Sequence, residues 1–408
     1  MGSLWHPFAQ MGAVERDGAF VVARGEGSHV FDAEGRRYLD ATAALWYANV
    51  GHGRTEIAEA VADQMSRIAA YTGFGDFATD VTEQLAERLA GIAPVPGSKI
   101  FFTSGGSDSI ETAAKLARRY WAEIGQPGRH TIIGRQKAYH GSHWAGTALG
   151  GIPPNQEGLG GPLLPDVAHV SWDDPESLRG TIEQVGAENV AAFFCEPVIG
   201  AGGVYPPPED YLLRARKICA ELDVLFIADE VITGYGRIGG SWFASTRFGL
   251  EPDLITTAKG LTSGYLPMGA VLVAPRVAEP FFTGQAWFRH GYTYSGHAAS
   301  AAAGLANLAI IERENLLESA LGLEAKLMQR LAPIGELDAV AEIRGGVGAL
   351  ASVQLADPAT AAAVSRELRD AGVIARPIGV GALQISPPLI FTDDDLDELV
   401  AGLQTVLG

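Results

Sequence analysis

The 408-residue sequence is short of cysteine and of positive charge. Its two cysteines, Cys195 and Cys219, stand in apolar or helix-like segments, so we expect buried thiols rather than a disulfide framework. So few cysteines in a long chain are typical of a reducing compartment, and we expect a cytoplasmic protein. His140 and His143 have no cysteine or carboxylate cluster nearby, so we predict no metal site. The formal net charge of −18 argues against nucleic acid or an anionic membrane as a partner.

Long apolar runs are missing as well. The longest candidate, His297–Ile311, is interrupted by Ser300 and Asn307 and is too short to span a membrane. The N-terminal segment has no basic start followed by an apolar core, so we expect no signal peptide. Hydrophobic residues still make up 47% of the sequence, which predicts a soluble protein with a large core. At this length we expect two domains.

The sequence does contain a lysine and an acid at the ends of two expected strands. The apolar run Val224–Ala228 ends in Asp229, and the run Asp253–Ala258 ends in Lys259. Open α/β sheets bind ligands at the carboxyl ends of their strands, so both side chains could face one crevice. Lysine forms Schiff bases with carbonyl groups, and a carboxylate keeps a pyridine nitrogen protonated. Pyridoxal 5'-phosphate (PLP) requires both, although the spacing alone favours an ordinary solvated lysine and a loop aspartate.

A glycine-rich turn elsewhere in the chain could bind an anion. The strand expected at Ile100–Thr103 leads into Ser104–Ser107, and a helical pattern follows from Ile110 onward. Backbone N–H groups at the start of a helix attract a phosphate, and the hydroxyl of Ser107 can add a donor. The alternative is a common glycine turn with a serine cap.

A second glycine motif, Gly234–Gly239, matches the GxGxxG dinucleotide fingerprint. Asp229 and Glu230 precede it and would repel a pyrophosphate, and the residues after it do not predict a convincing helix. Asp253 lies near the distance expected for a ribose-binding acid. We therefore keep a nicotinamide-dependent oxidoreductase as the alternative from a different class, although it leaves Lys259 unexplained.

Two of these stretches together resemble a known family. DEVITGYGRIG, starting at Asp229, and TTAKGLTSGYLPMGA, starting at Thr256, resemble the signature of class III, or omega, PLP-dependent aminotransferases. The resemblance implies the α/β PLP-dependent transferase fold type I, with a doubly wound, mostly parallel sheet and a smaller α+β domain. We expect the large PLP-binding domain at residues 51–309, and a small domain formed by residues 1–50 and 310–408.

The resemblance also implies which residues hold the cofactor. Lys259 would carry PLP as a Schiff base, Asp229 would pair with the pyridine nitrogen, and Val231 would pack on the ring. Further cofactor contacts would come from Gly106 and Ser107 at the phosphate, Tyr139 and the adjacent His140 at the ring, Glu196 at another strand end, and Thr293 from a partner subunit. The last contact implies a homodimer with shared active sites.

The phosphate turn departs from the family pattern. The usual Asn and Ser before the Gly-Ser pair are Ser104 and Gly105 here, and the usual Glu after it is Asp108. Backbone donors do not depend on these side chains, so we still expect a phosphate site, with a different local geometry.

The expected reaction moves an amino group from an amine or omega-amino acid to a keto acid such as pyruvate. Trp46 and Arg376 match substrate-pocket positions of the family, although a core tryptophan and a surface ion pair are equally compatible with the sequence. Ile232 stands where relatives acting on ornithine or 4-aminobutyrate commonly have Gln, which favours simple amines or omega-amino acids with pyruvate. Racemases, aminomutases and decarboxylases share the same apparatus and remain alternatives.

Overall fold

A seven-stranded sheet forms the centre of the larger part of the molecule. The structure is a computed structural model that describes residues 3–161 and 163–408. The strands are β4 (Lys99–Thr103), β5 (Thr131–Arg135), β6 (Val167–Val170), β7 (Val190–Cys195), β8 (Leu225–Asp229), β9 (Leu254–Thr257) and β10 (Gly269–Val273). Their order is β4-β10-β9-β8-β7-β5-β6, and β10 alone runs antiparallel to its neighbours. This confirms the doubly wound, mostly parallel sheet.

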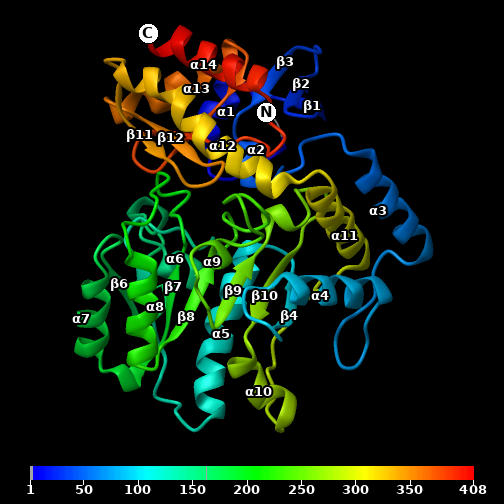
Figure 1. Ribbon diagram of the computed structural model, residues 1–408, viewed down its shortest axis with the longest axis vertical. Helices are drawn as coiled ribbons and strands as arrows, with labels where there is room; N and C mark the ends of the chain where they lie inside the picture. The colour runs from blue at the N-terminus through cyan, green and yellow to red at the C-terminus, as the bar shows by residue number, and fades with distance from the viewer. Residues whose placement is uncertain (1–2, 162) are drawn as a thin grey trace.

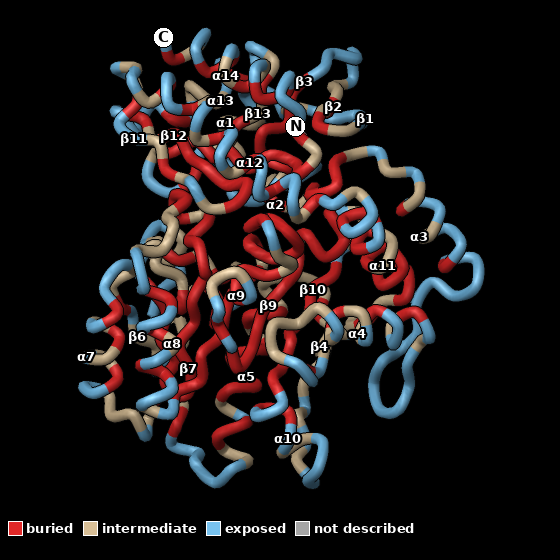
Figure 2. Tube along the Cα trace, viewed as in Figure 1, coloured by how far each residue is buried: buried red, intermediate tan, exposed pale blue. Residues whose placement is uncertain are grey.

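Helices cover both faces of this sheet, as the ribbon in Figure 1 shows. They include α5 (Gly106–Glu123), α6 (Trp144–Leu149), α7 (Pro175–Val185), α8 (Tyr211–Glu221) and α10 (Pro275–Thr283). Successive strand residues belong to opposite layers: Phe193 packs in the cluster with α8, and Phe194 packs in the cluster with α5. The strands are therefore buried on both faces (Figure 2), which explains their continuous apolar runs.

The two chain ends build the remaining sheets, and both termini lie at the top of Figure 1. One sheet consists of β1 (Val22–Glu26), β2 (His29–Asp32), β3 (Arg37–Asp40) and β13 (Val373–Ile374). The other consists of β11 (Val340–Gly345), β12 (Ala351–Leu355), β15 (Ala382–Ile385) and β14 (Arg376–Ile378). Strand β13 runs parallel to β3, with Val373 opposite Leu39. The domain boundaries after residues 50 and 309 stay a prediction.

The other helices connect or cover these sheets. They are α1 (Met11–Asp17), α2 (Ala43–Trp46), α3 (Thr55–Arg67), α4 (Asp80–Ile92), α9 (Ala244–Arg247), α11 (Ala298–Arg313), α12 (Leu316–Leu331), α13 (Ala361–Asp370) and α14 (Asp393–Leu407). Short 3₁₀ turns occupy Pro153–Asn155, Ala187–Asn189, Lys259–Leu261, Ala332–Glu336 and Pro358–Thr360. Among the described residues, none of the helices has both the length and the apolar character needed to cross a membrane.

The sequence pattern predicts one strand at Ile343–Gln354 and another at Val373–Pro377, and both predictions were wrong in extent. The segment 343–354, expected as one strand, forms the hairpin β11–β12, because Gly346 and Gly348 adopt positive φ angles of 81° and 67° and reverse the chain. The segment 373–377 divides between β13 and β14, which belong to different sheets. The two cysteines are buried free thiols, as expected, and burial raises the pKa of Cys195 to about 11.

Candidate active site

A cavity of about 650 Å³ opens at the carboxyl ends of β7 and β8. The small-domain segments around α2 and β14 also line it. Ten of the eleven site residues predicted from the sequence border this cavity: Trp46, Gly106, Ser107, Tyr139, His140, Glu196, Asp229, Val231, Lys259 and Arg376. Residues far apart in the sequence thus converge on one crevice, at the place where open α/β sheets bind their ligands.

Asp229, the last residue of β8, is held by three neighbours. Its Oδ2 lies 2.7 Å from Nδ1 of His140, and its Oδ1 accepts hydrogen bonds of 3.1 Å from Oγ1 of Thr256 and the N–H of Val231. The carboxylate is only 4% exposed. These contacts fix its orientation, so one buried acceptor borders the cavity in a defined position.

Lys259 lies two residues after the end of β9 and begins a 3₁₀ turn with a φ of 39°. Burial lowers the pKa of its amine to about 8, although the carboxylates of Asp229 and Glu196 act in the opposite direction. A lysine with this pKa is partly neutral near physiological pH. Its amine can therefore act as a nucleophile or a base without a large energetic cost.

The start of α5 forms one wall of the cavity. A Cβ added at Gly106 would lie 2.9 Å from Cγ1 of Val231, so glycine lets the helix approach that residue closely. The Oγ of Ser107 accepts a hydrogen bond of 3.1 Å from the N–H of Ser142. The helix is 18 residues long, and its first N–H groups have no intrahelical acceptors. This arrangement suits a phosphate group.

Asp108, which stands where the family usually has Glu, stabilises this turn by hydrogen bonds. Its Oδ2 accepts a hydrogen bond of 3.1 Å from the N–H of Ser104, and its Oδ1 lies 2.7 Å from Nε2 of His143. The side chain therefore ties the turn before α5 to the segment after Tyr139. The departure from the family pattern alters the neighbours of the turn and preserves its fold.

Glu196 supports Tyr139, a relationship that the sequence left open. Its carboxylate accepts hydrogen bonds of 2.9 Å from the N–H of Tyr139 and 3.0 Å from the N–H of Gly200. Burial raises the pKa of Glu196. The acid thus joins the segment after β5 to the segment after β7 and orients the backbone that carries Tyr139.

Trp46 and Arg376 meet on the small-domain side of the cavity. The guanidinium carbon of Arg376 lies 4.8 Å from the ring centroid of Trp46, and Nε donates to Oε1 of Gln384 over 3.2 Å. Trp46 is 3% exposed, so it is buried and also borders the cavity. No ion pair involves Arg376 within the part of the chain that the structure describes. Its guanidinium N–H groups are therefore available to a bound carboxylate.

Several cavity residues escaped the sequence analysis. They are Phe8, Leu45, Ile110, Gly141, Ile152, Pro154, Asn155, Ala201 and Pro377–Gly379. The segment Gly150–Pro165 is rich in glycine and proline and predicts a long loop of the kind that is often functional, and this signal points to Ile152, Pro154 and Asn155. Phe8 lies in an N-terminal segment with no motif, so no sequence signal could have found it.

Thr293 is the one predicted site residue that does not border the cavity. It is exposed and begins a turn at residues 293–296, between α10 and α11. The turn lies beside the loop that carries Phe74, because a Cβ at Gly291 would meet the Phe74 ring at 3.0 Å. The hydroxyl of the adjacent Tyr292 donates to the carbonyl oxygen of Asp108 over 3.1 Å, so this segment packs near the start of α5, although Thr293 itself does not line the cavity.

The GxGxxG motif is filled by side chains rather than open to a ligand. A Cβ at Gly236 would lie 2.8 Å from Cδ2 of Leu317, and one at Gly239 would lie 2.8 Å from the N of Leu321. The glycines permit close packing against α12. The following helix, α9, has only four residues. This geometry does not support a dinucleotide site.

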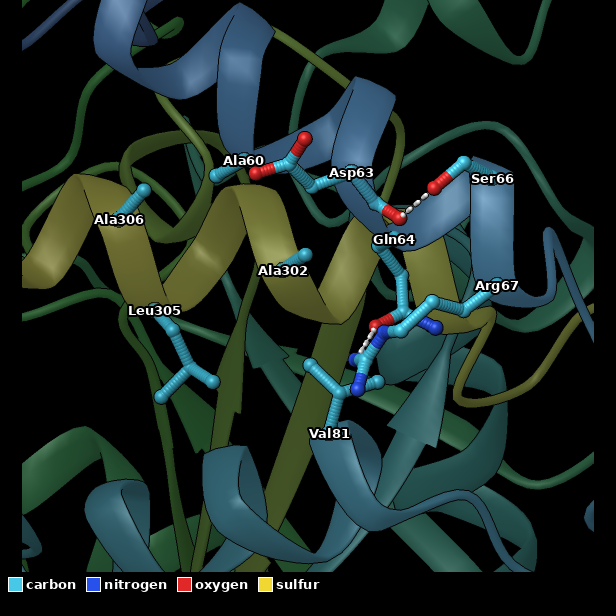
Figure 3. A pocket seen from close by; sticks show the side chains of 9 residues that line it. All are labelled: Ala60, Asp63, Gln64, Ser66, Arg67, Val81, Ala302, Leu305 and Ala306. Carbon is cyan, nitrogen blue, oxygen red and sulfur yellow. Dashed lines mark hydrogen bonds between the residues drawn. The ribbon is translucent and has the colours of Figure 1, made fainter.

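A second large cavity, of about 660 Å³, lies between α3, α4 and α11 and is drawn in Figure 3. Two of its polar side chains are already engaged locally: Arg67 donates to Oε1 of Gln64, and Ser66 donates to the carbonyl oxygen of Asp63. The described residues contain no group of three or more His, Cys, Asp or Glu side chains that could hold a metal ion. The catalytic chemistry therefore concentrates in the first cavity.

The sequence is similar to one protein family over almost its whole length. The family described as aminotransferase class-III matches residues 11–407. A putrescine–pyruvate aminotransferase of Pseudomonas aeruginosa is 39% identical, over 97% of this chain and 91% of the relative. An omega-amino acid–pyruvate aminotransferase of Pseudomonas putida is 37% identical, over 99% of this chain and 95% of the relative.

Solved structures similar to this chain are also transaminases. A transaminase from the marine bacterium Virgibacillus has a TM-score of 0.95 at 38% identity, covering 99% of this chain and 96% of its own. An amine transaminase from an uncultivated Pseudomonas species, described in its PLP-bound form, has a TM-score of 0.94 at 37% identity. That likeness covers 100% of this chain and 98% of the other, so it includes every element that lines the cavity.

Proposed function

Because the chain belongs to the class-III aminotransferases, which depend on PLP, we propose that Lys259 anchors this cofactor and that Asp229 pairs with its ring nitrogen. The chain is an omega-type transaminase. The observation that supports the assignment most is the convergence of Lys259, Asp229 and the start of α5 on one cavity. The nicotinamide alternative has no comparable site, since leucine side chains pack against its glycine motif.

The residues present fit PLP. Gly106 keeps the phosphate wall free of a side chain that would collide with Val231. The orientation of Asp229 is set by His140 and Thr256, and a fixed carboxylate suits a pyridinium nitrogen. Tyr139 and Val231 border the cavity and would contact the ring.

PLP, when bound, acts as an electron sink for the carbon that loses or gains the amino group. Lys259 Nζ would move a proton between the donor carbon and carbon C4′ of the cofactor, and its lowered pKa suits both accepting and releasing that proton. Asp229 stabilises positive charge at the ring nitrogen. Glu196 and His140 orient the two contacts, Tyr139 and Asp229, on which the geometry depends.

We propose that the donors are simple amines or omega-amino acids and that the acceptor is a keto acid such as pyruvate. The names of the two Pseudomonas relatives support this choice. The apolar Ile232 borders the cavity, and Arg376 offers free N–H groups to a carboxylate. The same pocket would hold an uncharged amine against Trp46 and Ile232 and a keto acid against Arg376.

We further propose a homodimer with shared active sites in the cytoplasm. Thr293 is exposed beside Phe74, and Tyr71, Phe77 and Tyr294 nearby in the sequence are each more than half exposed. Large exposed aromatic groups of this kind mark association surfaces. The two buried free thiols support a reducing compartment.

The cofactor assignment is tested by mapping the lysine. The purified protein should be yellow, and borohydride reduction should leave a stable adduct on the peptide that contains Lys259. Lys259→Ala should lose the adduct. Lys137→Ala is the matched control, because its amine lies between the rings of Trp172 and Tyr205, and this variant should keep the adduct. An adduct on another lysine, or a response to NADH in place of PLP, would refute the proposal.

The shared sites are tested by mixing two inactive variants. Lys259→Ala removes the anchor, and Thr293→Asp places a negative charge where the partner's phosphate is expected. A heterodimer of the two variants contains one site with both defects and one site with neither, so mixing should restore activity. Light scattering should report a dimer. An active monomer, or no recovery from a verified heterodimer, would show that the sites are not shared.

A further inference from the structure

The backbone of α2 adopts an unusual conformation beside the active site. Ala43, Ala44 and Trp46 have φ angles of 45°, 56° and 62°, and none of them is Gly, Asn or Asp. Ala44 combines its φ with a ψ of −82°, far from any helical conformation. L-residues avoid this region because the Cβ collides with the backbone, so the surroundings must hold the segment in place.

Packing alone does not explain how the segment is held. Leu45 and Trp46 border the active-site cavity of about 650 Å³. Thr42, Ala44 and Tyr47 border a second cavity of about 510 Å³ on the other side. The segment thus borders two cavities, although Ala43 and Trp46 are themselves buried, and the faces toward the cavities have few van der Waals partners. Hydrogen bonds must contribute much of the constraint.

Asp40 accepts three of these hydrogen bonds, and Gln384 and Ser386 donate others to the carbonyl oxygen of Thr42. Its Oδ1 accepts from the N–H of Thr42 over 3.0 Å and from Oγ1 of Thr42 over 2.7 Å. Its Oδ2 accepts from the N–H of Ala44 over 2.7 Å and lies 2.8 Å from Nε2 of His52. The carboxylate is 2% exposed. Burial raises the pKa of Asp40, but the hydrogen bonds from His52 and Thr42 and the charge of His52 bring it below its ordinary value.

The segment matters because of where it places Trp46. The ring centroid of Trp46 lies 5.1 Å from Nζ of Lys259 and 4.8 Å from the guanidinium carbon of Arg376. The ring thus contacts both cations of the cavity. A small rotation of the backbone at Ala44 would move the ring away from both.

We infer that Asp40, supported by His52, is a positioning residue that holds the left-handed turn at Ala43–Ala44 and thereby fixes Trp46 against Arg376. The kinetic part of this inference rests on the proposed function, in which Arg376 receives the acceptor carboxylate. The structural part concerns Trp46 alone and stands without it. Asp40 lies outside the active-site cavity and acts only through the backbone.

Asp40→Asn tests the inference in the PLP-loaded protein. An asparagine has one acceptor oxygen, so it cannot serve the N–H groups of both Thr42 and Ala44. With 5-fluorotryptophan incorporated, the ¹⁹F resonance of Trp46, identified by its loss in Trp46→Phe, should shift or broaden while the other tryptophan resonances stay. KM for pyruvate should rise roughly 10-fold, the loss expected for one charge-assisted hydrogen bond. The kcat should change little, because Lys259 and Asp229 lie on other elements.

Glycine rescue separates positioning from general destabilisation. Glycine adopts positive φ without a steric penalty, so adding Ala44→Gly to Asp40→Asn should return the Trp46 resonance and the KM for pyruvate toward their original values. Ala48→Gly is the matched control. Ala48 is a buried alanine four residues further on with a negative φ, and glycine there should rescue nothing.

Two results would overturn the inference. One is an unchanged Trp46 resonance and an unchanged KM in Asp40→Asn, and the other is equal rescue by Ala44→Gly and Ala48→Gly. If Asp40→Asn does not fold, Ala44→Gly alone decides: relief of strain should raise Tm, and an unchanged or lower Tm contradicts the inference. If the protein lacks transaminase activity but its Trp46 resonance responds as described, the proposed function fails and the structural inference stands.

Discussion

Lys259 combines strong burial with two nearby carboxylates, and burial dominates. Its pKa is lowered to about 8, whereas Asp229 and Glu196 act to raise it and Arg376 acts to lower it. The amine condenses with an aldehyde only when neutral, so protonation below pH 8 should slow the capture of PLP. The fraction of Lys259 with a neutral amine therefore grows as pH rises toward the pKa and levels off above it.

We therefore expect the rate of PLP binding to the cofactor-free enzyme to rise roughly 10-fold per pH unit below about pH 8 and to flatten above it. The rate can be followed by the appearance of yellow absorbance after mixing. Glu196→Gln should move the midpoint to lower pH, because it removes a carboxylate that stabilises the charged amine. A midpoint near about 10, the ordinary value for lysine, would contradict the role of burial.

Arg376 is expected to act on one half-reaction only. Arg376→Ala removes a charge-assisted hydrogen bond to the acceptor carboxylate, worth about 1.5–3 kcal/mol, so kcat/KM for pyruvate should fall roughly 10- to 150-fold. The half-reaction with an uncharged amine donor has no such bond to lose. Single-turnover measurements of the two half-reactions will show the difference.

Arg344 provides the control for that change. It is another arginine of the small-domain sheets, stacked 4.5 Å from the Tyr205 ring centroid, and it does not border the cavity. Arg344→Ala should lower stability without distinguishing pyruvate from the amine. Equal losses of both half-reactions in Arg376→Ala would show that this arginine is structural.

The sequence pattern predicted where Asp229 and Lys259 lie, whereas the roles expected for them and for Arg376 came from the family resemblance. Asp229 and Lys259 end two apolar runs, and both fall at the carboxyl edge of the sheet as expected. No such pattern marks Asp40. Asp40 is important because Ala43 and Ala44 adopt positive φ angles, which the tertiary structure imposes. The run DATAALW contains no glycine or asparagine, the residues that usually indicate positive φ in a sequence.

At the level of the element, α5 depends on a glycine at its first residue. Gly106→Ala would place a Cβ 2.9 Å from Cγ1 of Val231, and relieving such a contact typically costs about 1–3 kcal/mol. Since Val231 is proposed to contact the PLP ring, we expect PLP affinity to fall roughly 5- to 150-fold, measured by fluorescence titration.

Gly105 and Val231 provide the controls for that prediction. Gly105 precedes Gly106 and has an extended φ of 175°, and a Cβ added there would have no atom within 4 Å, so Gly105→Ala should bind PLP normally. Adding Val231→Ala to Gly106→Ala makes room for the methyl group and should recover part of the affinity. Equal effects of Gly105→Ala and Gly106→Ala would contradict the steric explanation.

Helices and strands could be predicted from the sequence where the spacing of apolar residues was enough to define them. The strands β4, β8 and β9 closely match the runs Ile100–Thr103, Val224–Ala228 and Asp253–Ala258 expected from the sequence. The hairpin β11–β12 was predicted as one strand because glycines are the only turn-forming residues between its two halves. Whether a glycine bends the chain depends on its φ, which the sequence does not contain.

At the scale of the whole molecule, Arg237 joins three distant segments. It is fully buried and donates to Oδ1 of Asn49, to the carbonyl of Ala349 and to the carbonyl of Pro387. Burial lowers the pKa of its guanidinium to about 9, and the charge of Asp40 opposes the shift. The side chain connects the segment after β8 to both chain ends.

Arg237→Met should therefore destabilise the protein severely. Three buried acceptors would lose their donor, and each unpaired group costs about 1–3 kcal/mol, so the total should reach about 3 kcal/mol or more. Arg313→Met is the control, because Arg313 is mostly exposed and pairs with Glu56 at the surface, a contact worth less than about 1 kcal/mol. Urea denaturation of both variants will rank them, and similar midpoints would contradict a connecting role for Arg237.

The parallel pairing of β3 with β13 sets an order of events during protein synthesis. All seven strands of the central sheet lie between residues 99 and 273, so they can assemble once that stretch has left the ribosome. Strand β3 must wait for Val373 and Ile374 to be translated before it gains its partner. Arg376 follows two residues later. Translation therefore completes the strands that carry Asp229 and Lys259 before the segment that carries Arg376, and a prematurely terminated chain would contain the lysine proposed to anchor PLP without the arginine proposed to bind the acceptor.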